Sequence, residues 1–262
     1  MAKVHLAPWL WALGGVALLV AVALAENLSA LGWVAGVAYL AVSSALLTVG
    51  LARRGMPRLG PANAVTATRS TLVGVVTALV VTSFIQHSPE ALLLAFVVPA
   101  LLLDAVDGWV ARRTHSETPL GARFDMEVDA FLLLVLSVAT GPTLGWWTLA
   151  IGLMRYAFVA AAWVFPWLGA QLPPRYWRKV VTAVCGIALA LAASGLAPLP
   201  VADAAVGVAL ALLVESFGRD VIWLVRARAT ARPSAPGTPA SPDAAGGRTA
   251  APAAPAQRAR RL

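Results

Sequence analysis

The chain has 262 residues, of which 60% are hydrophobic and only 12% carry a charged side chain, and its mean hydropathy is +0.78. Soluble domains carry about 25% charged residues, so this composition excludes a soluble globular protein and indicates an integral membrane protein. The formal net charge is +8. The basic residues lie between apolar runs and in the C-terminal tail, a distribution that fits membrane topology and no nucleic-acid partner.

Eight apolar segments are long enough to be membrane helices, since a span needs about 20 mostly apolar residues. In chain order they cover residues 9–25, 29–52, 70–86, 91–111, 124–140, 145–167, 180–197 and 201–225. Every second connection between them holds several basic residues, and the other connections hold no Lys or Arg. Because basic connections stay in the cytoplasm, the sequence predicts an all-α, polytopic membrane bundle of about eight helices. We expect a bacterial-type plasma membrane, with both termini in the cytoplasm.

The two ends of the chain are expected to be additions to a central unit. Residues 1–52 are predicted to form two accessory membrane helices, residues 53–229 the core, and residues 230–262 a cytoplasmic tail. The tail is rich in Ala, Pro and Arg, cannot bury a core and is predicted to be disordered. We expect residues 1–25 to be a retained span, although Ala23, Leu24 and Ala25 also resemble a signal-peptide cleavage site. Gly32 and Gly36 form a Gly-x-x-x-Gly motif, which allows close helix packing within the chain or in a homodimer.

Four aspartates lie in and around the fourth and fifth segments: Asp104, Asp107, Asp125 and Asp129. The members of each pair are three or four residues apart, so they share one face of their helix. A short turn makes the two helices antiparallel, and a rise of 1.5 Å per residue places all four carboxylates within about 12 Å of the cytoplasmic boundary. Carboxylates at membrane depth need compensation, and an all-carboxylate site suits Mg²⁺ or Mn²⁺. The alternative is pairing with nearby arginines, which are Arg112, Arg113 and Arg123.

With their neighbours, these residues form the pattern D-x-x-D-G-x-x-A-R, then eight residues, then G-x-x-x-D-x-x-x-D, from Asp104 to Asp129. The pattern resembles the signature of the CDP-alcohol phosphotransferase family at every specified position. The resemblance covers roughly residues 60–226. Upstream, the stretch from Asn63 to Arg69 resembles the family's P-N-x-x-T-x-x-R element, except that Ala62 stands where the family has proline.

The resemblance implies a six-helix core and an enzyme that transfers a phosphatidyl or other phospho-alcohol group from a CDP-alcohol to a hydroxyl acceptor, releasing CMP. It further implies that the four aspartates hold two Mg²⁺ or Mn²⁺ ions and that Asp129 is also the general base. The CDP-binding residues that it implies are Gly108, Ala111, Arg112, Gly121 and Thr66.

Basic residues outside the pattern are candidates for binding the acceptor. Arg155 lies inside an apolar segment, where an arginine is a functional candidate, although it could equally pair with Glu127. Arg175 and Lys179 lie near the start of the seventh segment. Arg178 and Lys179 begin a stretch that resembles a G-K-x-x-T element of the family, with Arg178 in place of glycine. Arg175 and Lys179 could bind an acceptor phosphate or only anchor the helix at the cytoplasmic surface.

The resulting hypothesis is an enzyme of phospholipid biosynthesis with CDP-diacylglycerol as donor and membrane lipids around it. The acceptors are ranked glycerol 3-phosphate first, inositol phosphate second and phosphatidylglycerol third. Two alternatives are an ion-coupled membrane transporter and an inactive family member that serves as a scaffold.

Overall fold

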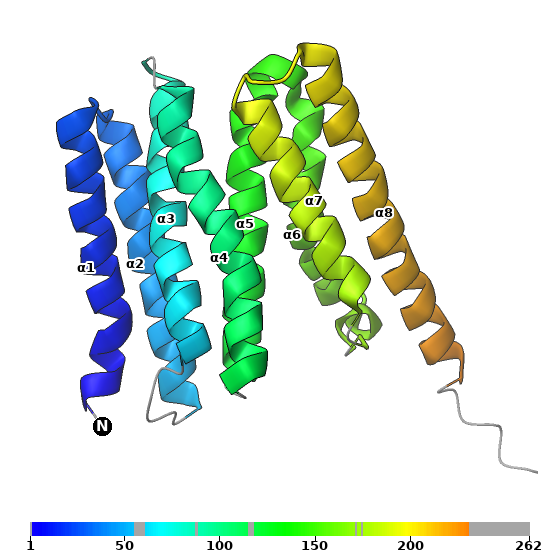
Figure 1. Ribbon diagram of the computed structural model, residues 1–262. Helices are drawn as coiled ribbons and strands as arrows, with labels where there is room; N and C mark the ends of the chain where they lie inside the picture. The colour runs from blue at the N-terminus through cyan, green and yellow to red at the C-terminus, as the bar shows by residue number, and fades with distance from the viewer. Residues whose placement is uncertain are drawn as a thin grey trace, which may run out of the picture.

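The computed structural model describes residues 2–54, 61–86, 89–114, 118–170, 172–173 and 175–230 (Figure 1). All but one of the residues of the tail predicted at 230–262 lie outside this part of the chain. The secondary structure of the described residues is helical: α1 (Ala2–Ala25), α2 (Ala30–Arg53), α3 (Pro61–Ser83), α4 (Glu90–Thr114), α5 (Pro119–Leu144), α6 (Leu149–Val164), α7 (Tyr176–Ala193) and α8 (Leu199–Thr230), with short 3₁₀ turns at Trp146–Thr148 and Pro166–Gly169.

The helices lie side by side in one bundle, and α1 begins at the same end at which α8 finishes (Figure 1). Seven described segments are long and apolar enough to cross a membrane, and they correspond to every helix except α4. α4 carries Glu90, Asp104 and Asp107, which lower its hydropathy, but it packs closely along α3 inside the bundle. The chain is therefore an integral, multi-pass, all-α membrane protein, as the sequence predicted.

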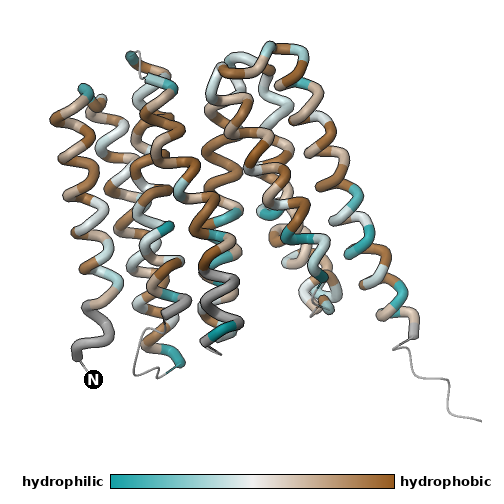
Figure 2. The backbone as a smooth tube through the Cα atoms, in the orientation of Figure 1, coloured by the Kyte–Doolittle hydropathy of each residue, from teal (hydrophilic) through white to brown (hydrophobic). Residues whose placement is uncertain are grey.

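Hydrophobic side chains supply both the lipid-facing surface and the core. Figure 2 shows hydrophobic positions along most of each helix and hydrophilic positions in the lower halves of α7 and α8. The main core joins α3, α4, α5, α7 and α8 through fully buried residues such as Val76, Val97, Leu136, Leu189 and Val206. In this core, α4 and α5 each pack against α3 and α7, and α4 and α5 are the two helices that carry the aspartates.

α3 and α5 begin earlier than the apolar segments predicted. α3 begins at Pro61 rather than at residue 70, and α5 begins at Pro119 rather than at residue 124. Proline is favoured at the start of a helix because its missing N–H would have no partner there. The Gly121 amide also donates a 3.0 Å hydrogen bond to Thr118 Oγ1, which caps α5. The added turns are polar, so a search for apolar segments leaves them out.

The accessory helices α1 and α2 pack mainly against α3. A Cβ atom at Gly32 would lie 2.7 Å from the backbone oxygen of Ala78, and one at Gly36 would lie 3.1 Å from that of Gly74. Both glycines are therefore required for the close approach of α2 to α3. In this structure the Gly-x-x-x-Gly motif serves packing within the chain, and a homodimer stays a prediction.

Candidate active site

Three of the four predicted aspartates come together in the half of the bundle that is nearer the end where the chain begins. Asp104 from α4 and Asp125 and Asp129 from α5 each offer a carboxylate oxygen, and these oxygens all lie within 4.8 Å of one another. The cause is the packing of α4 and α5 against the same helix, α3, which brings acidic positions of the two antiparallel helices close together. The side chains of Asp107, Gly108, Ala111 and Arg112 lie outside the described part of the structure, although their backbone belongs to α4.

A residue of α3, Arg69, lies at the centre of this cluster. Its Nη1 atom donates to Asp104 Oδ1 at 2.8 Å and also to Asp129 Oδ1. Its Nη2 atom donates to Asp125 Oδ1 and lies 3.4 Å from the backbone oxygen of the same residue. One guanidinium group therefore bonds carboxylates from two other helices.

Arg69 was not among the predicted site residues. A signal was present, because Arg69 ends the stretch that resembles P-N-x-x-T-x-x-R and precedes a long apolar run. A charged residue there needs a partner inside the bundle. The predicted alternative partners of the aspartates were instead the arginines in and beside the turn between α4 and α5.

Burial differs between the arginine and its partners. The Arg69 side chain is 1% exposed, whereas the side chains of Asp104, Asp125 and Asp129 are 34%, 23% and 22% exposed. The guanidinium group thus forms the buried floor of the cluster. The three carboxylates remain partly accessible to a ligand.

The beginning of α3 also meets the beginning of α5 beside this cluster. A Cβ atom placed on Gly121 would overlap Asn63 Oδ1. Asn63 is 2% exposed, and its Nδ2 atom has no hydrogen-bond partner among the described residues. Thr66, almost one helical turn after Asn63, is buried as well. Helix packing is therefore sufficient to explain the glycine at position 121, and its role in CDP binding stays a prediction.

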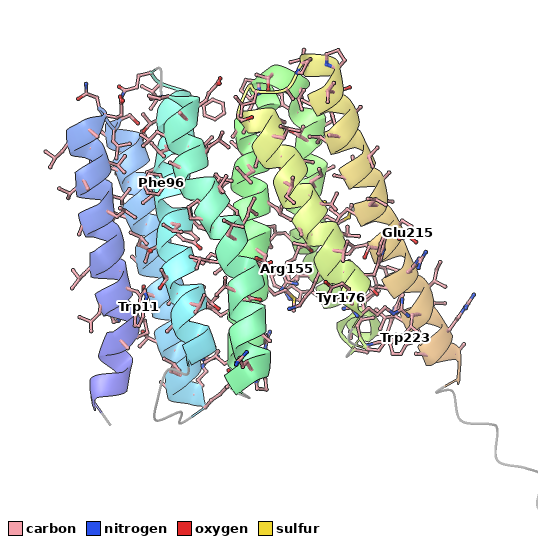
Figure 3. The ribbon with its side chains drawn as sticks, in the orientation of Figure 1. Trp11, Phe96, Arg155, Tyr176, Glu215 and Trp223 are labelled. Carbon is pink, nitrogen blue, oxygen red and sulfur yellow. The ribbon has the colours of Figure 1, made fainter. Side chains whose placement is uncertain are left out.

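Of the predicted acceptor residues, Arg155 is paired within the bundle. Its Nη2 atom forms an ion pair with Glu127 Oε1, its Nε atom lies 3.4 Å from Glu127 Oε2, and its Nη1 atom lies 3.0 Å from Met126 Sδ. Arg155 belongs to α6, which packs against α5 (Figure 3). This is the pairing that the sequence left open as an alternative. Arg175 and Lys179 are exposed near the start of α7 and form no ion pair with the residues that the structure describes.

Arg178, which replaces the glycine of the family element, bonds to α8. Its Nε atom lies 3.5 Å from Oδ2 of the buried Asp220, and its Nη2 atom donates to the Pro173 carbonyl oxygen. Close by on α8, Glu215 forms an ion pair with Arg219 and accepts a 3.2 Å hydrogen bond from Trp177 Nε1 (Figure 3). Charged contacts therefore tie the beginning of α7 to α8.

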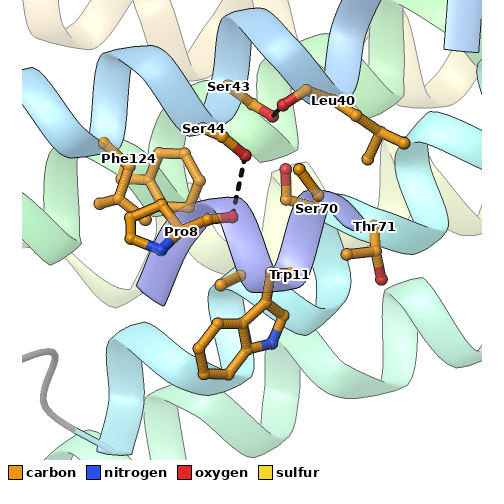
Figure 4. Close-up of a pocket in the computed structure, with 11 residues that line it drawn as sticks. Pro8, Trp11, Leu40, Ser43, Ser44, Ser70, Thr71 and Phe124 are labelled. Atoms are coloured by element: carbon orange, nitrogen blue, oxygen red, sulfur yellow. Dashed lines mark hydrogen bonds between the residues drawn. The ribbon is translucent and has the colours of Figure 1, made fainter. Parts of the chain in front are cut away.

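A small cavity lies on the other side of α3, between α3 and the accessory helices (Figure 4). Hydroxyl groups line it, among them those of Ser43, Ser44 and Ser70, and Ser44 Oγ donates to the Pro8 carbonyl oxygen at 3.1 Å. Its volume of about 10 Å³ has room for about one water molecule. It is far too small for a nucleotide, so the aspartate cluster remains the candidate site.

Residues 59–217 match the profile of the CDP-alcohol phosphatidyltransferase family. The match covers more than half of the chain, so this protein belongs to the CDP-alcohol phosphatidyltransferase family and is a transferase of phosphate-containing groups. Family members act in membranes on CDP-alcohols and hydroxyl acceptors in phospholipid synthesis, and they generally depend on divalent metals. The matched segment begins before α3 and ends within α8, which leaves α1 and α2 outside it. No curated protein and no solved structure matches the chain.

Proposed function

We propose that this protein transfers a phosphatidyl group from CDP-diacylglycerol to a hydroxyl acceptor at the cytoplasmic face of the membrane, with release of CMP. The observation that carries this proposal is the convergence of Asp104, Asp125 and Asp129 in one half of a membrane bundle. A nucleotide headgroup can reach such a site from water while the acyl chains of the donor stay in the bilayer. Residues 53–229 form the catalytic core, residues 1–52 the accessory helices and residues 230–262 a tail.

The donor atoms of the cluster fit a hard divalent cation, because three partly exposed carboxylates offer oxygens within 4.8 Å of one another. We assign Asp104, Asp107, Asp125 and Asp129 as the residues that hold two Mg²⁺ or Mn²⁺ ions. When bound, such ions neutralise the negative charge that develops on the attacking and leaving oxygens of phosphoryl transfer.

The proposed chemistry assigns one proton transfer to the chain itself. Asp129 accepts the proton of the acceptor hydroxyl, and the resulting oxygen attacks the phosphorus that carries the diacylglycerol. The bond from this phosphorus to the oxygen of CMP breaks, and CMP leaves. Asp129 is suited to this role because it belongs to the cluster and its carboxylate remains 22% exposed.

Binding of the two substrates is assigned to the neighbouring residues. We assign Thr66, Gly108, Ala111, Arg112 and Gly121 to the cytidine diphosphate. Arg175 and Lys179 carry exposed charges that suit the phosphate of an acceptor. These charges support an acceptor that carries a phosphate group. Among such acceptors we rank glycerol 3-phosphate first, inositol phosphate second and phosphatidylglycerol third. Arg155 takes part only if an anionic acceptor displaces Glu127 from it.

The test is CMP release by the purified protein with Mg²⁺ or Mn²⁺, CDP-diacylglycerol and each of the three acceptors. Asp129→Asn is expected to abolish CMP release without loss of the folded state, which a thermal unfolding curve in detergent checks. The matched control is Asp203→Asn, which changes an exposed acid near the start of α8 and should leave CMP release unchanged. Wild-type turnover by Asp129→Asn would remove Asp129 as the base. Ion-driven solute uptake into liposomes without CMP formation would instead favour a transporter.

A further inference from the structure

Arg69 is the largest of the side chains that are almost completely buried, and it is a charged one. A buried charge persists only when its partners satisfy it, because removal from water costs several kilocalories per mole per ion. The partners of Arg69 include three carboxylates on α4 and α5, separated from it by 35 to 60 residues in the sequence. The planar guanidinium group of arginine presents five N–H donors in a fixed geometry, whereas the ammonium group of lysine is a compact charge with three donors. A lysine would therefore not reproduce these contacts.

The three described carboxylates of the cluster carry more charge than Arg69 alone balances. Asp104, Asp125 and Asp129 bring three negative charges, and the guanidinium group of Arg69 supplies one positive charge at the buried side. Each of the three carboxylate groups accepts from Arg69 through its Oδ1 atom. A carboxylate has two oxygens and about four acceptor positions, so a carboxylate that accepts from Arg69 can also bind a cation.

We propose that Arg69 is a positioning residue that acts as an internal counterion, holding the aspartates of α4 and α5 together before a divalent cation binds. The bundle can then fold with its site assembled in the absence of metal. This inference rests on the proposed function, since it assumes that the same carboxylates bind the metal. Its consequence is that a protein without the guanidinium group depends on the metal for stability.

The test compares thermal unfolding of the full-length protein in detergent, once with EDTA and once with Mn²⁺. Arg69→Met removes the charge and keeps much of the side-chain length. In EDTA the carboxylates of this variant repel one another without the Arg69 charge between them, so we expect a lower Tm than that of the wild type. Mn²⁺ should raise the Tm of Arg69→Met by several degrees more than it raises the Tm of the wild type.

Arg178→Met is the matched control because it removes a guanidinium group from an aspartate outside the cluster, the buried Asp220. It should lower the Tm by the same amount in EDTA and in Mn²⁺. The same behaviour by Arg69→Met would overturn the inference, because it would show a role in packing alone. If Arg69→Met does not fold in either buffer, Arg69→Lys replaces it, and a Mn²⁺ shift equal to that of the wild type would then count against the inference.

Two further measurements on the wild type separate this inference from the proposed function. Mn²⁺ binding is followed by electron paramagnetic resonance, and CMP release is measured with CDP-diacylglycerol. If the wild type neither binds Mn²⁺ nor forms CMP, the proposed function fails, and the inference that rests on it fails too. If it does both while Arg69→Met responds to Mn²⁺ as the wild type does, only the role of Arg69 is wrong.

Discussion

Gly121→Ala tests whether the contact between α3 and α5 supports the site. The added Cβ atom would overlap Asn63 Oδ1 and would lie 3.0 Å from Thr118 Oγ1. Asn63 is 2% exposed, so its amide group cannot turn into water to make room. The alanine keeps the backbone N–H that donates to Thr118, so the cap of α5 is retained. The expected effect is therefore one of overpacking, at the helix contact beside the aspartate cluster.

Overpacking in a well-packed interior costs about 1–3 kcal/mol. For a chain of this size such a loss lowers the Tm by roughly 2–12 °C. We expect this decrease in a thermal unfolding experiment in detergent, together with lower CMP release, because α3 also carries Thr66 and Arg69. A Cβ atom at Gly218 in α8 would meet nothing within 4 Å, so Gly218→Ala is the matched control. It should leave the Tm unchanged or stabilise by up to about 1 kcal/mol through helix propensity.

The double variant Asn63→Ala/Gly121→Ala separates packing from substrate binding. Removal of the Asn63 amide makes room for the new methyl group, so part of the lost Tm should return. Recovery of the Tm without recovery of the KM for CDP-diacylglycerol would support the predicted contact between Gly121 and the cytidine diphosphate. The packing argument is refuted if Gly121→Ala is as stable and as active as Gly218→Ala.

Three other changes probe the helix contacts and the metal. Gly32→Leu should lower the Tm by an amount equivalent to about 1–3 kcal/mol, because a Cβ atom at position 32 would lie 2.7 Å from the Ala78 carbonyl oxygen. Gly14→Leu is its control, because a Cβ atom at position 14 would meet no other atom within 4 Å. Arg178→Met and Asp220→Asn should each destabilise the folded protein by about 1–3 kcal/mol, and the double variant should destabilise it by less than the sum of the two single changes. Additive Tm changes would argue against the Arg178–Asp220 ion pair as a stabilising contact. EDTA should abolish CMP release, and Mg²⁺ or Mn²⁺ should restore it; full turnover in EDTA would contradict the metal assignment.

The sequence by itself determined the class of the protein, and the family comparison is in agreement with it. Runs of about 20 apolar residues can be stable only as helices in a membrane, because a bilayer offers no partners for exposed backbone groups. The ends of α3 and α5 were less predictable, since their first turns are polar and owe their helical form to Pro61, Pro119 and the Thr118 cap. Apolar length therefore predicts where a span lies but not how far its helix continues beyond the apolar run.

The same division applies to the site. The spacing of Asp104 and Asp107, and of Asp125 and Asp129, follows from the helical repeat, so local sequence predicts that each pair shares a face. Only the tertiary structure decided that Arg69 joins three of these aspartates, that Glu127 takes Arg155 and that Asp220 takes Arg178. These partners are on different helices, and the rotation and depth at which one helix meets another depend on side-chain packing along the whole contact, which no local pattern records.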